Sequence, residues 1–145
     1  MSTFDYTAGQ VWFRDGLVPF KDATLHIASS PVLYGLAVYT VFNVRWSEAS
    51  TELLIFRLKD HYKRLCDSAR IMDFGSFAAM MDYKTFEMTM LQLLKANDIR
   101  EQVLVRATIF IDELIAGTKA HGLTTSFSAY IYPMGAFYPK HGVNV

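Results

Sequence analysis

The sequence predicts an α+β fold, in which an antiparallel sheet is covered on one face by two main helices. Three observations support this prediction. Short segments rich in β-branched and aromatic residues lie towards both ends of the chain and predict strands. Two central segments have apolar residues every three or four positions, as amphipathic helices do. Strand pairs, then a helical block, then further strands are typical of an antiparallel sheet with helices on one face.

The predicted strands are separated by turn-forming residues. Segments 11–13 and 17–20 flank the dipeptide Asp15-Gly16, which is favoured in tight turns, and so predict a hairpin. Residues 29–35 are bounded by serines, a proline and a glycine, and predict a turn region. The other strands expected from the same composition are residues 38–46, 53–56, 103–112 and 126–132.

Two helices are predicted in the middle of the chain. The first begins at Leu58, and its inward face is expected to contain Leu58, Tyr62, Leu65, Ala69 and Met72. The second is expected to begin near Asp82 and to end near Asn97, a residue that tolerates the left-handed conformation at helix ends. Its inward residues are expected to be Tyr83, Phe86, Met90, Leu93 and Leu94.

Composition excludes several classes of protein. The length of 145 residues predicts one domain, and no apolar run reaches the roughly 18 to 20 residues that cross a bilayer. Basic and acidic residues balance at 14 each, so no global charge favours nucleic acid or an anionic membrane. The single cysteine, Cys66, excludes an internal disulfide, and residues 1–10 lack a signal-peptide pattern. We expect a cytoplasmic protein without nucleic-acid or membrane partners.

Common catalytic motifs are also absent. The chain contains no Gly-rich nucleotide loop, no zinc-protease or paired-cysteine motif and no serine-hydrolase elbow. The spacing of its four histidines does not suggest a metal site, so no metal is predicted. Cys66 lies beside the apolar side of the first helix and is expected to be an inert, buried thiol.

One stripe on the first predicted helix is a candidate anion site. Arg57, His61, Arg64 and Ser68 follow one another beside the apolar face. An arginine at the edge of a packed face offers a planar fork of donors that suits a phosphate group. A solvated helix face explains the same charge pattern, and helical spacing does not decide between the two.

Several strings in this sequence match one known family. The most specific is segment 56–71, FRLKDHYKRLCDSARI, in which Phe-Arg-Leu, His, Arg-Leu and Ser-Ala stand in the family's order. With the other strings it resembles the class IV aminotransferases, which depend on pyridoxal phosphate, and the N-terminal small domain of the branched-chain type in particular. The resemblance spans nearly the whole chain; the other matching strings are Val11-Trp12-Phe13, Asp22-Ala23, Leu33-Tyr34-Gly35, Val38-Tyr39, Val105-Arg106, Ile109-Phe110, 132–137 and 142–145.

The resemblance implies roles for individual residues. In this family the arginine of the His-x-x-Arg-Leu string contacts the cofactor phosphate. Arg64 is therefore expected to bind the phosphate of pyridoxal phosphate, and Arg57 to be structural. A second set is expected to line the substrate pocket without acting as catalysts: Tyr34, Tyr39, Val41, Asn43, Arg106 and Phe137.

Departures from the family pattern leave the substrate open. Branched-chain enzymes usually read Phe-Glu-Gly-Ile-Arg where residues 39–43 read Tyr-Thr-Val-Phe-Asn, and they commonly have tyrosines at the positions of Leu104 and Phe137. The tyrosine and valine of the first string are closer to the D-amino acid enzymes, whereas Arg106 and the string 133–137 are closer to the branched-chain enzymes. We expect a branched-chain or hydrophobic amino acid as donor; the alternatives are a D-amino acid aminotransferase or an aminodeoxychorismate lyase.

Transamination needs a lysine that binds the cofactor covalently, and no lysine of this chain stands in that family context. The resemblance implies that residues 1–138 form the small domain and that residues 139–145 begin the connection to a large catalytic domain outside this chain. We expect this chain alone to be inactive, and the whole enzyme to be a homodimer that acts on a small-molecule amino acid and a 2-oxo acid. The rival of another class is a non-catalytic binding or dimerisation module.

Overall fold

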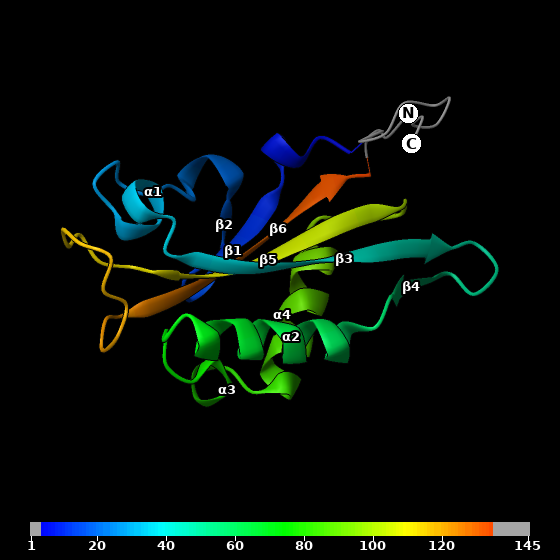
Figure 1. The fold of residues 1–145 in the computed structure, drawn as a ribbon. Helices are drawn as coiled ribbons and strands as arrows, with labels where there is room; N and C mark the ends of the chain where they lie inside the picture. Colours follow the sequence, from blue (N-terminus) through cyan, green and yellow to red (C-terminus); the bar gives the residue numbers. More distant parts are fainter. Residues whose placement is uncertain (1–3, 135–145) are drawn as a thin grey trace, which may run out of the picture.

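The computed structural model describes residues 4–134, which form one six-stranded antiparallel sheet with helices packed against it. The order of the strands across the sheet is β2-β1-β6-β5-β3-β4. Figure 1 shows α2, α3 and α4 on one side of this sheet and α1 on the other. The strands are β1 (Gln10–Phe13), β2 (Gly16–Pro19), β3 (Ala37–Ser47), β4 (Glu52–Ile55), β5 (Val103–Ile111) and β6 (Thr125–Pro133). The predicted fold class is confirmed.

All six predicted strands are present, but the first hairpin turns one residue earlier than expected. Phe13 pairs with Gly16, so the two turn residues are Arg14 and Asp15. Arg14 has a φ of 58°, the positive value that a tight hairpin turn requires and that was expected at the Asp-Gly pair. Its guanidinium bonds both carboxylate oxygens of Asp112, at 2.5 and 2.8 Å, which stabilises the turn.

The two main helices lie where they were predicted. They are α2 (Leu58–Ile71) and α4 (Tyr83–Ala96), and a short α3 (Phe77–Met80), which was not predicted, lies between them. Asp82 caps α4, because its carboxylate accepts a hydrogen bond of 2.8 Å from the backbone nitrogen of Thr85.

The predicted inward position of Met72 was wrong, whereas the second helix ends near Asn97 as predicted. Met72 lies beyond the last turn of α2 and is 40% exposed. Asn97 has a φ of −101°, and the left-handed residue is Asp98, which follows it. The side chain of Asn97 instead bonds Gln10 of β1 in both directions, at 2.8 and 3.0 Å, so it joins the end of α4 to the sheet.

The region predicted as a turn, residues 29–35, contains a helix of one turn, α1 (Ser30–Tyr34). Its five residues are too few for apolar periodicity to reveal. The helix ends at Gly35, whose φ of 67° suits glycine, and the Gly35 nitrogen donates to the Pro31 carbonyl at 3.2 Å. The other short helical turns are η1 (Tyr6–Ala8) and η2 (Phe20–Asp22).

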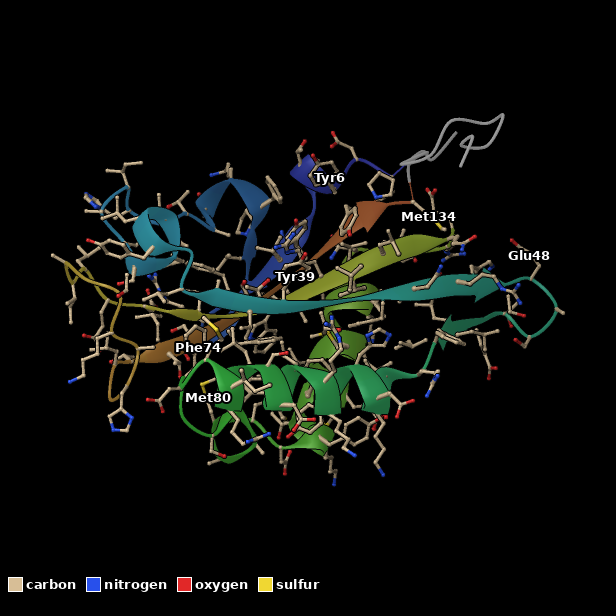
Figure 2. The ribbon with its side chains drawn as sticks, in the orientation of Figure 1. Tyr6, Tyr39, Glu48, Phe74, Met80 and Met134 are labelled. Atoms are coloured by element: carbon tan, nitrogen blue, oxygen red, sulfur yellow. The ribbon has the colours of Figure 1, made fainter. Side chains whose placement is uncertain are left out.

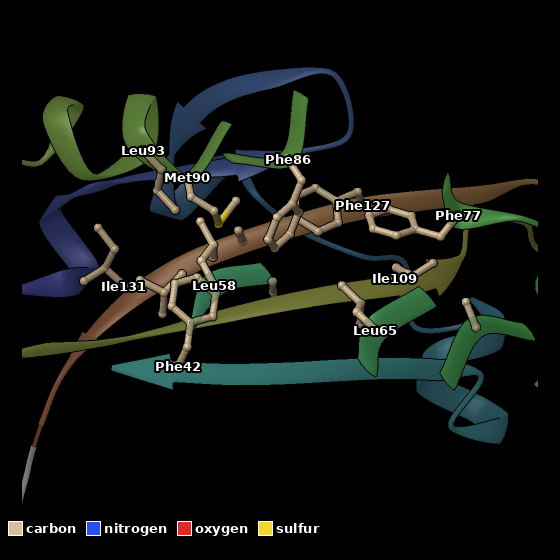
Figure 3. Close-up of a cluster of buried hydrophobic side chains, with 14 of the residues drawn as sticks. Phe42, Leu58, Leu65, Phe77, Phe86, Met90, Leu93, Ile109, Phe127 and Ile131 are labelled. Atoms are coloured by element: carbon tan, nitrogen blue, oxygen red, sulfur yellow. The ribbon is translucent and has the colours of Figure 1, made fainter. Parts of the chain in front are cut away.

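The hydrophobic core lies between the sheet and the helices α2, α3 and α4. Figure 3 shows the side chains of both layers interdigitating, with Phe86 of α4 close to Phe127 of β6. Leu65 and Phe86 are fully buried, as the helical spacing predicted. From the strands, every second residue enters this core, including Phe42 and Val44 of β3, Val105 and Ile109 of β5, and Phe127 and Ile131 of β6. Residues 4–134 include no helix long and apolar enough to cross a membrane.

Candidate functional site

The alternate residues of the central strands form a second surface, the open face, on the side of the sheet away from α2 and α4. Neighbouring strands place Tyr39 opposite Thr108, Val41 opposite Arg106 and Asn43 opposite Leu104. Because residues directly opposite one another point to the same side, the register groups side chains far apart in the sequence. Four of the six predicted pocket residues therefore share the open face: Tyr39, Val41, Asn43 and Arg106.

Arg106 and Tyr39 are in direct contact on this face. The guanidinium carbon of Arg106 lies 3.7 Å from the centre of the Tyr39 ring, within the range of a cation–π interaction. Figure 2 shows Tyr39 over β3, on the side of the sheet away from α2. The neighbouring Tyr132 is half-buried, and loss of hydration raises the pKa of its hydroxyl. The open face thus presents the Arg106 guanidinium against the aromatic ring of Tyr39.

Arg64 reaches the same strand from the helix side. Its Nη2 donates to the Tyr39 carbonyl at 3.1 Å and to the Thr40 hydroxyl at 3.1 Å. The first half of β3 has β5 on one side only, because β4 pairs with β3 from Val44 onwards. Arg64 therefore fills hydrogen-bonding positions at an open strand edge, and its guanidinium lies at the edge between the core face and the open face.

Arg57 behaves differently from Arg64. It occupies the residue before α2 in a left-handed conformation, with φ 48° and ψ 41°, and its Nε donates to Asp60 at 2.6 Å. The stripe expected on α2 is thus divided. Its first arginine makes a local ion pair, whereas Arg64 and His61 turn towards β3.

The sequence does not single out Thr40 as a site residue; it stands where the family has a glutamate. Its side chain is fully buried, and its Oγ1 lies 2.8 Å from Nδ1 of His61. Alternation along the strand was the available signal, because Thr40 lies between two residues that were predicted to face the pocket. Burial, followed by the positive charge of Arg64, lowers the pKa of His61, so its imidazole is neutral at pH 7.

The remaining predicted site residues lie apart from this group or outside the described residues. Tyr34 ends α1 and is 38% exposed. A pocket of about 460 Å³ lies nearby on the open face, between α1 and the strands, and Tyr34 is not among its lining residues. Its walls include Phe13, Ala37, Thr108, Phe110 and Tyr130. Phe137 and the proposed boundary after residue 138 lie outside residues 4–134.

Pyridoxal phosphate fits the donors that Arg64 offers. The hydrogen bonds of the described residues engage Nη2 of Arg64 and leave its Nε and Nη1 without a protein partner. The side chain is exposed to solvent, so a phosphate group has access to these two donors. Residues 4–134 contain no cluster of side chains able to hold a metal ion.

No protein-family model matches the chain. Among curated proteins it is 26% identical over 128 residues to a probable branched-chain-amino-acid aminotransferase of Aquifex aeolicus, covering 87% of this chain and 40% of that protein. It is 28% identical over 131 residues to the branched-chain-amino-acid aminotransferase of Pseudomonas aeruginosa, covering 89% of this chain and 40% of that protein. The chain therefore spans about two fifths of the length of these relatives.

Solved structures show the same relationship. The branched-chain aminotransferase of Thermoproteus uzoniensis with norvaline superposes with a TM-score of 0.75 and 26% identity, over 88% of this chain and 41% of that one. The enzyme of Thermobaculum terrenum in its PLP-form gives a TM-score of 0.76 at 23% identity, over 89% and 41% of the two chains. In sequence and in fold, this chain is similar to the N-terminal small domain of the class IV branched-chain aminotransferases.

Proposed function

We propose that the chain is the small domain of a pyridoxal-phosphate-dependent transaminase. The whole enzyme would exchange an amino group between a branched-chain or hydrophobic amino acid and a 2-oxo acid, with Arg64 bound to the cofactor phosphate. The observation that supports this most directly is the placement of Arg64, which is held at the edge of β3 with Nε and Nη1 available. The relatives that cover nine tenths of this chain have the same activity in their names.

The open face supplies the proposed substrate wall. Bound pyridoxal phosphate supplies the reactive aldehyde and the electron-withdrawing ring on which an amino group is exchanged. Tyr39 and Val41 offer apolar surface, which favours side chains that gain from leaving water. Arg106 offers a cation for a carboxylate, and its contact with the Tyr39 ring restricts where that cation lies. The proposed wall includes Tyr34, Asn43 and Phe137 as well.

The exposure of the described lysines supports the proposal that the lysine that binds the cofactor belongs to another domain. The six lysines in residues 4–134 are all exposed, whereas a lysine that forms an imine with the cofactor is usually desolvated or placed beside another cation. The proposal therefore assigns residues 1–138 to the small domain and the lysine to a larger domain that follows. It includes the homodimer that the resemblance implies and the cytoplasmic location expected from the sequence composition.

The phosphate role is tested by comparing two arginines of the same chain. In the full-length enzyme, Arg64→Ala should weaken the binding of pyridoxal phosphate about ten- to a hundredfold, as expected for a charge-assisted hydrogen bond. Arg57→Ala is the matched control, because among the described residues the Arg57 side chain forms its hydrogen bond locally, with Asp60. Equal cofactor dissociation constants for the two variants, measured by spectroscopic titration, would contradict the assignment of Arg64.

The chain alone provides a second test. Mixed with pyridoxal phosphate, it should form no adduct at a particular lysine and should transfer no amino group. Borohydride trapping followed by peptide mass mapping would detect such an adduct. A single lysine modified in high yield would contradict the proposal that the lysine that binds the cofactor lies in another domain.

The substrate class is tested with a panel of amino donors at a fixed acceptor. The apolar wall favours leucine, isoleucine and valine over donors with acidic side chains at this position. Tyr39 and Val41 also favour the D-amino acid aminotransferases, which remain the second candidate. A catalytic efficiency ten times higher for D-alanine or D-glutamate than for any branched L-amino acid would select that candidate instead.

A further inference from the structure

A chain of three polar side chains connects the core to the edge of β3. Arg64 Nη2 lies 3.1 Å from Thr40 Oγ1, which lies 2.8 Å from Nδ1 of His61. Thr40 has no exposed surface, so its hydroxyl has no access to bulk water. The ring of Phe42 packs on the imidazole at 5.5 Å between centres, which restricts the position of His61.

The direction of these hydrogen bonds follows from the donors available. A guanidinium only donates, so Thr40 Oγ1 accepts from Arg64. The Thr40 hydroxyl hydrogen then needs an acceptor, and among the described residues His61 Nδ1 is the one within hydrogen-bonding distance. His61 is therefore neutral, with its proton on Nε2, and it orients the hydroxyl so that an oxygen lone pair faces the arginine.

We propose that Thr40 and His61 are positioning residues, which hold the Arg64 guanidinium where it presents Nε and Nη1 to a phosphate group. The inference rests on the proposed phosphate role of Arg64. Neither residue touches the cofactor in this proposal. A guanidinium restrained by protein contacts loses less conformational entropy when it binds an anion than one that rotates freely, so the restraint adds affinity.

The charges around His61 agree with this arrangement. Arg64 and Arg57 favour the neutral imidazole, and Asp60 opposes them from the same helix. From β3, the neighbours are the uncharged Thr40 and Phe42. Protonation of His61 would place a donor where the Thr40 hydroxyl needs an acceptor, so the neutral form is the one compatible with the chain of hydrogen bonds.

The test measures the affinity of pyridoxal phosphate for the full-length enzyme by equilibrium dialysis. Thr40→Val keeps the shape of the side chain and removes the hydroxyl, and we expect roughly three- to tenfold weaker binding. Thr40→Ser should restore most of the affinity. His61→Leu should weaken binding as Thr40→Val does, whereas His61→Asn, whose amide oxygen is able to accept near the position of Nδ1, should restore it.

Controls separate positioning through Arg64 from a general loss of structure. Thr89→Val removes another buried threonine, on α4, and should leave cofactor affinity unchanged. Thr40→Val added to Arg64→Ala should cause no further loss, because the arginine through which Thr40 acts is absent. Unchanged affinity in Thr40→Val, together with weakened affinity in Arg64→Ala, would overturn this inference alone. Unchanged affinity in Arg64→Ala would overturn the phosphate assignment and this inference with it.

One measurement needs no variant. Nitrogen chemical shifts distinguish the two neutral forms of histidine, and we expect His61 in the wild-type enzyme to carry its proton on Nε2 at pH 7.5. A proton on Nδ1 would overturn the inference, since the Thr40 hydroxyl would then lack its acceptor.

Discussion

The two faces of the sheet are made by the same strands and have opposite chemistry. On β5, Val103, Val105, Ala107 and Ile109 point into the core and have at most 1% of their surface exposed. Leu104, Arg106 and Thr108 alternate with them and point to the open face. One face is occupied by helices and sets stability, whereas the other holds a cation, aromatic rings and a pocket.

The largest expected effect on stability is on the core face. Phe86 has no exposed surface, and its ring contacts those of Tyr62, Phe77 and Phe127. Phe86→Ala should lower the free energy of unfolding by about 3 to 5 kcal/mol, measured by urea denaturation. Val41→Ala on the open face is the control and should cost less than about 1 kcal/mol. Comparable losses for the two variants would show that the open face is also part of the stabilising core.

An intermediate effect is expected where α4 begins. The carboxylate of Asp82 accepts from the Thr85 nitrogen, and this bond lowers the pKa of Asp82. Asp82→Ala should lower the melting temperature, while Asp82→Asn retains an acceptor and should lower it less. The two variants are compared by thermal unfolding at pH 7. If Asp82→Ala leaves the melting temperature unchanged, capping does not help to hold the helical layer on the sheet.

A smaller effect on stability is expected at Asp112. Its carboxylate accepts hydrogen bonds from Arg14 of the first hairpin and from Ser126 of β6. Arg14, followed by Ser126, lowers the pKa of the Asp112 carboxyl. Because the folded-state pKa is depressed, the pair stabilises the protein at neutral pH, and this contribution is lost as the pH falls below about 4. The Arg14 side chain is 47% exposed, so solvent limits the contribution to less than about 1 kcal/mol. The free energy of unfolding of Asp112→Asn should depend less on pH than that of the wild type, as measured by denaturation between about pH 3 and about pH 7.

The smallest effect on stability is expected at Tyr39. Tyr39→Leu removes the ring beneath Arg106 and should cost about 0.5 kcal/mol, the value of an exposed cation–π contact. Tyr39→Phe keeps the ring and should be close to neutral. In the full-length enzyme, Tyr39→Leu should nevertheless raise KM for the amino donor, because Arg106 loses the contact that restricts it. A large loss of stability with unchanged kinetics would reverse the proposed contrast between the two faces.

The sequence predicts the core face well and the open face poorly, for a physical reason. Burial imposes a spacing, so Leu65 and Phe86 were found from helical periodicity alone. The open face has no such constraint, and its residues were selected only through the family resemblance. Local sequence patterns also do not predict contacts between elements, such as the hydrogen bond between Arg64 and Thr40, which are 24 residues apart in the sequence. Local pattern was misleading at Arg14, where an arginine rather than the following Asp-Gly pair adopts the positive φ.

The position of Arg64 at the edge of β3 has a consequence for self-association. Unpaired carbonyl and amide groups on a strand edge are a template for pairing with a strand of another molecule. Arg64 occupies the Tyr39 carbonyl and places a charge there, and charges on edge strands oppose aggregation. At the opposite edge of the sheet, β2 is only four residues long and ends in Pro19, which has no amide to donate. Arg64 thus protects the exposed half of β3, and its replacement by a small apolar residue should increase aggregation of the unliganded protein.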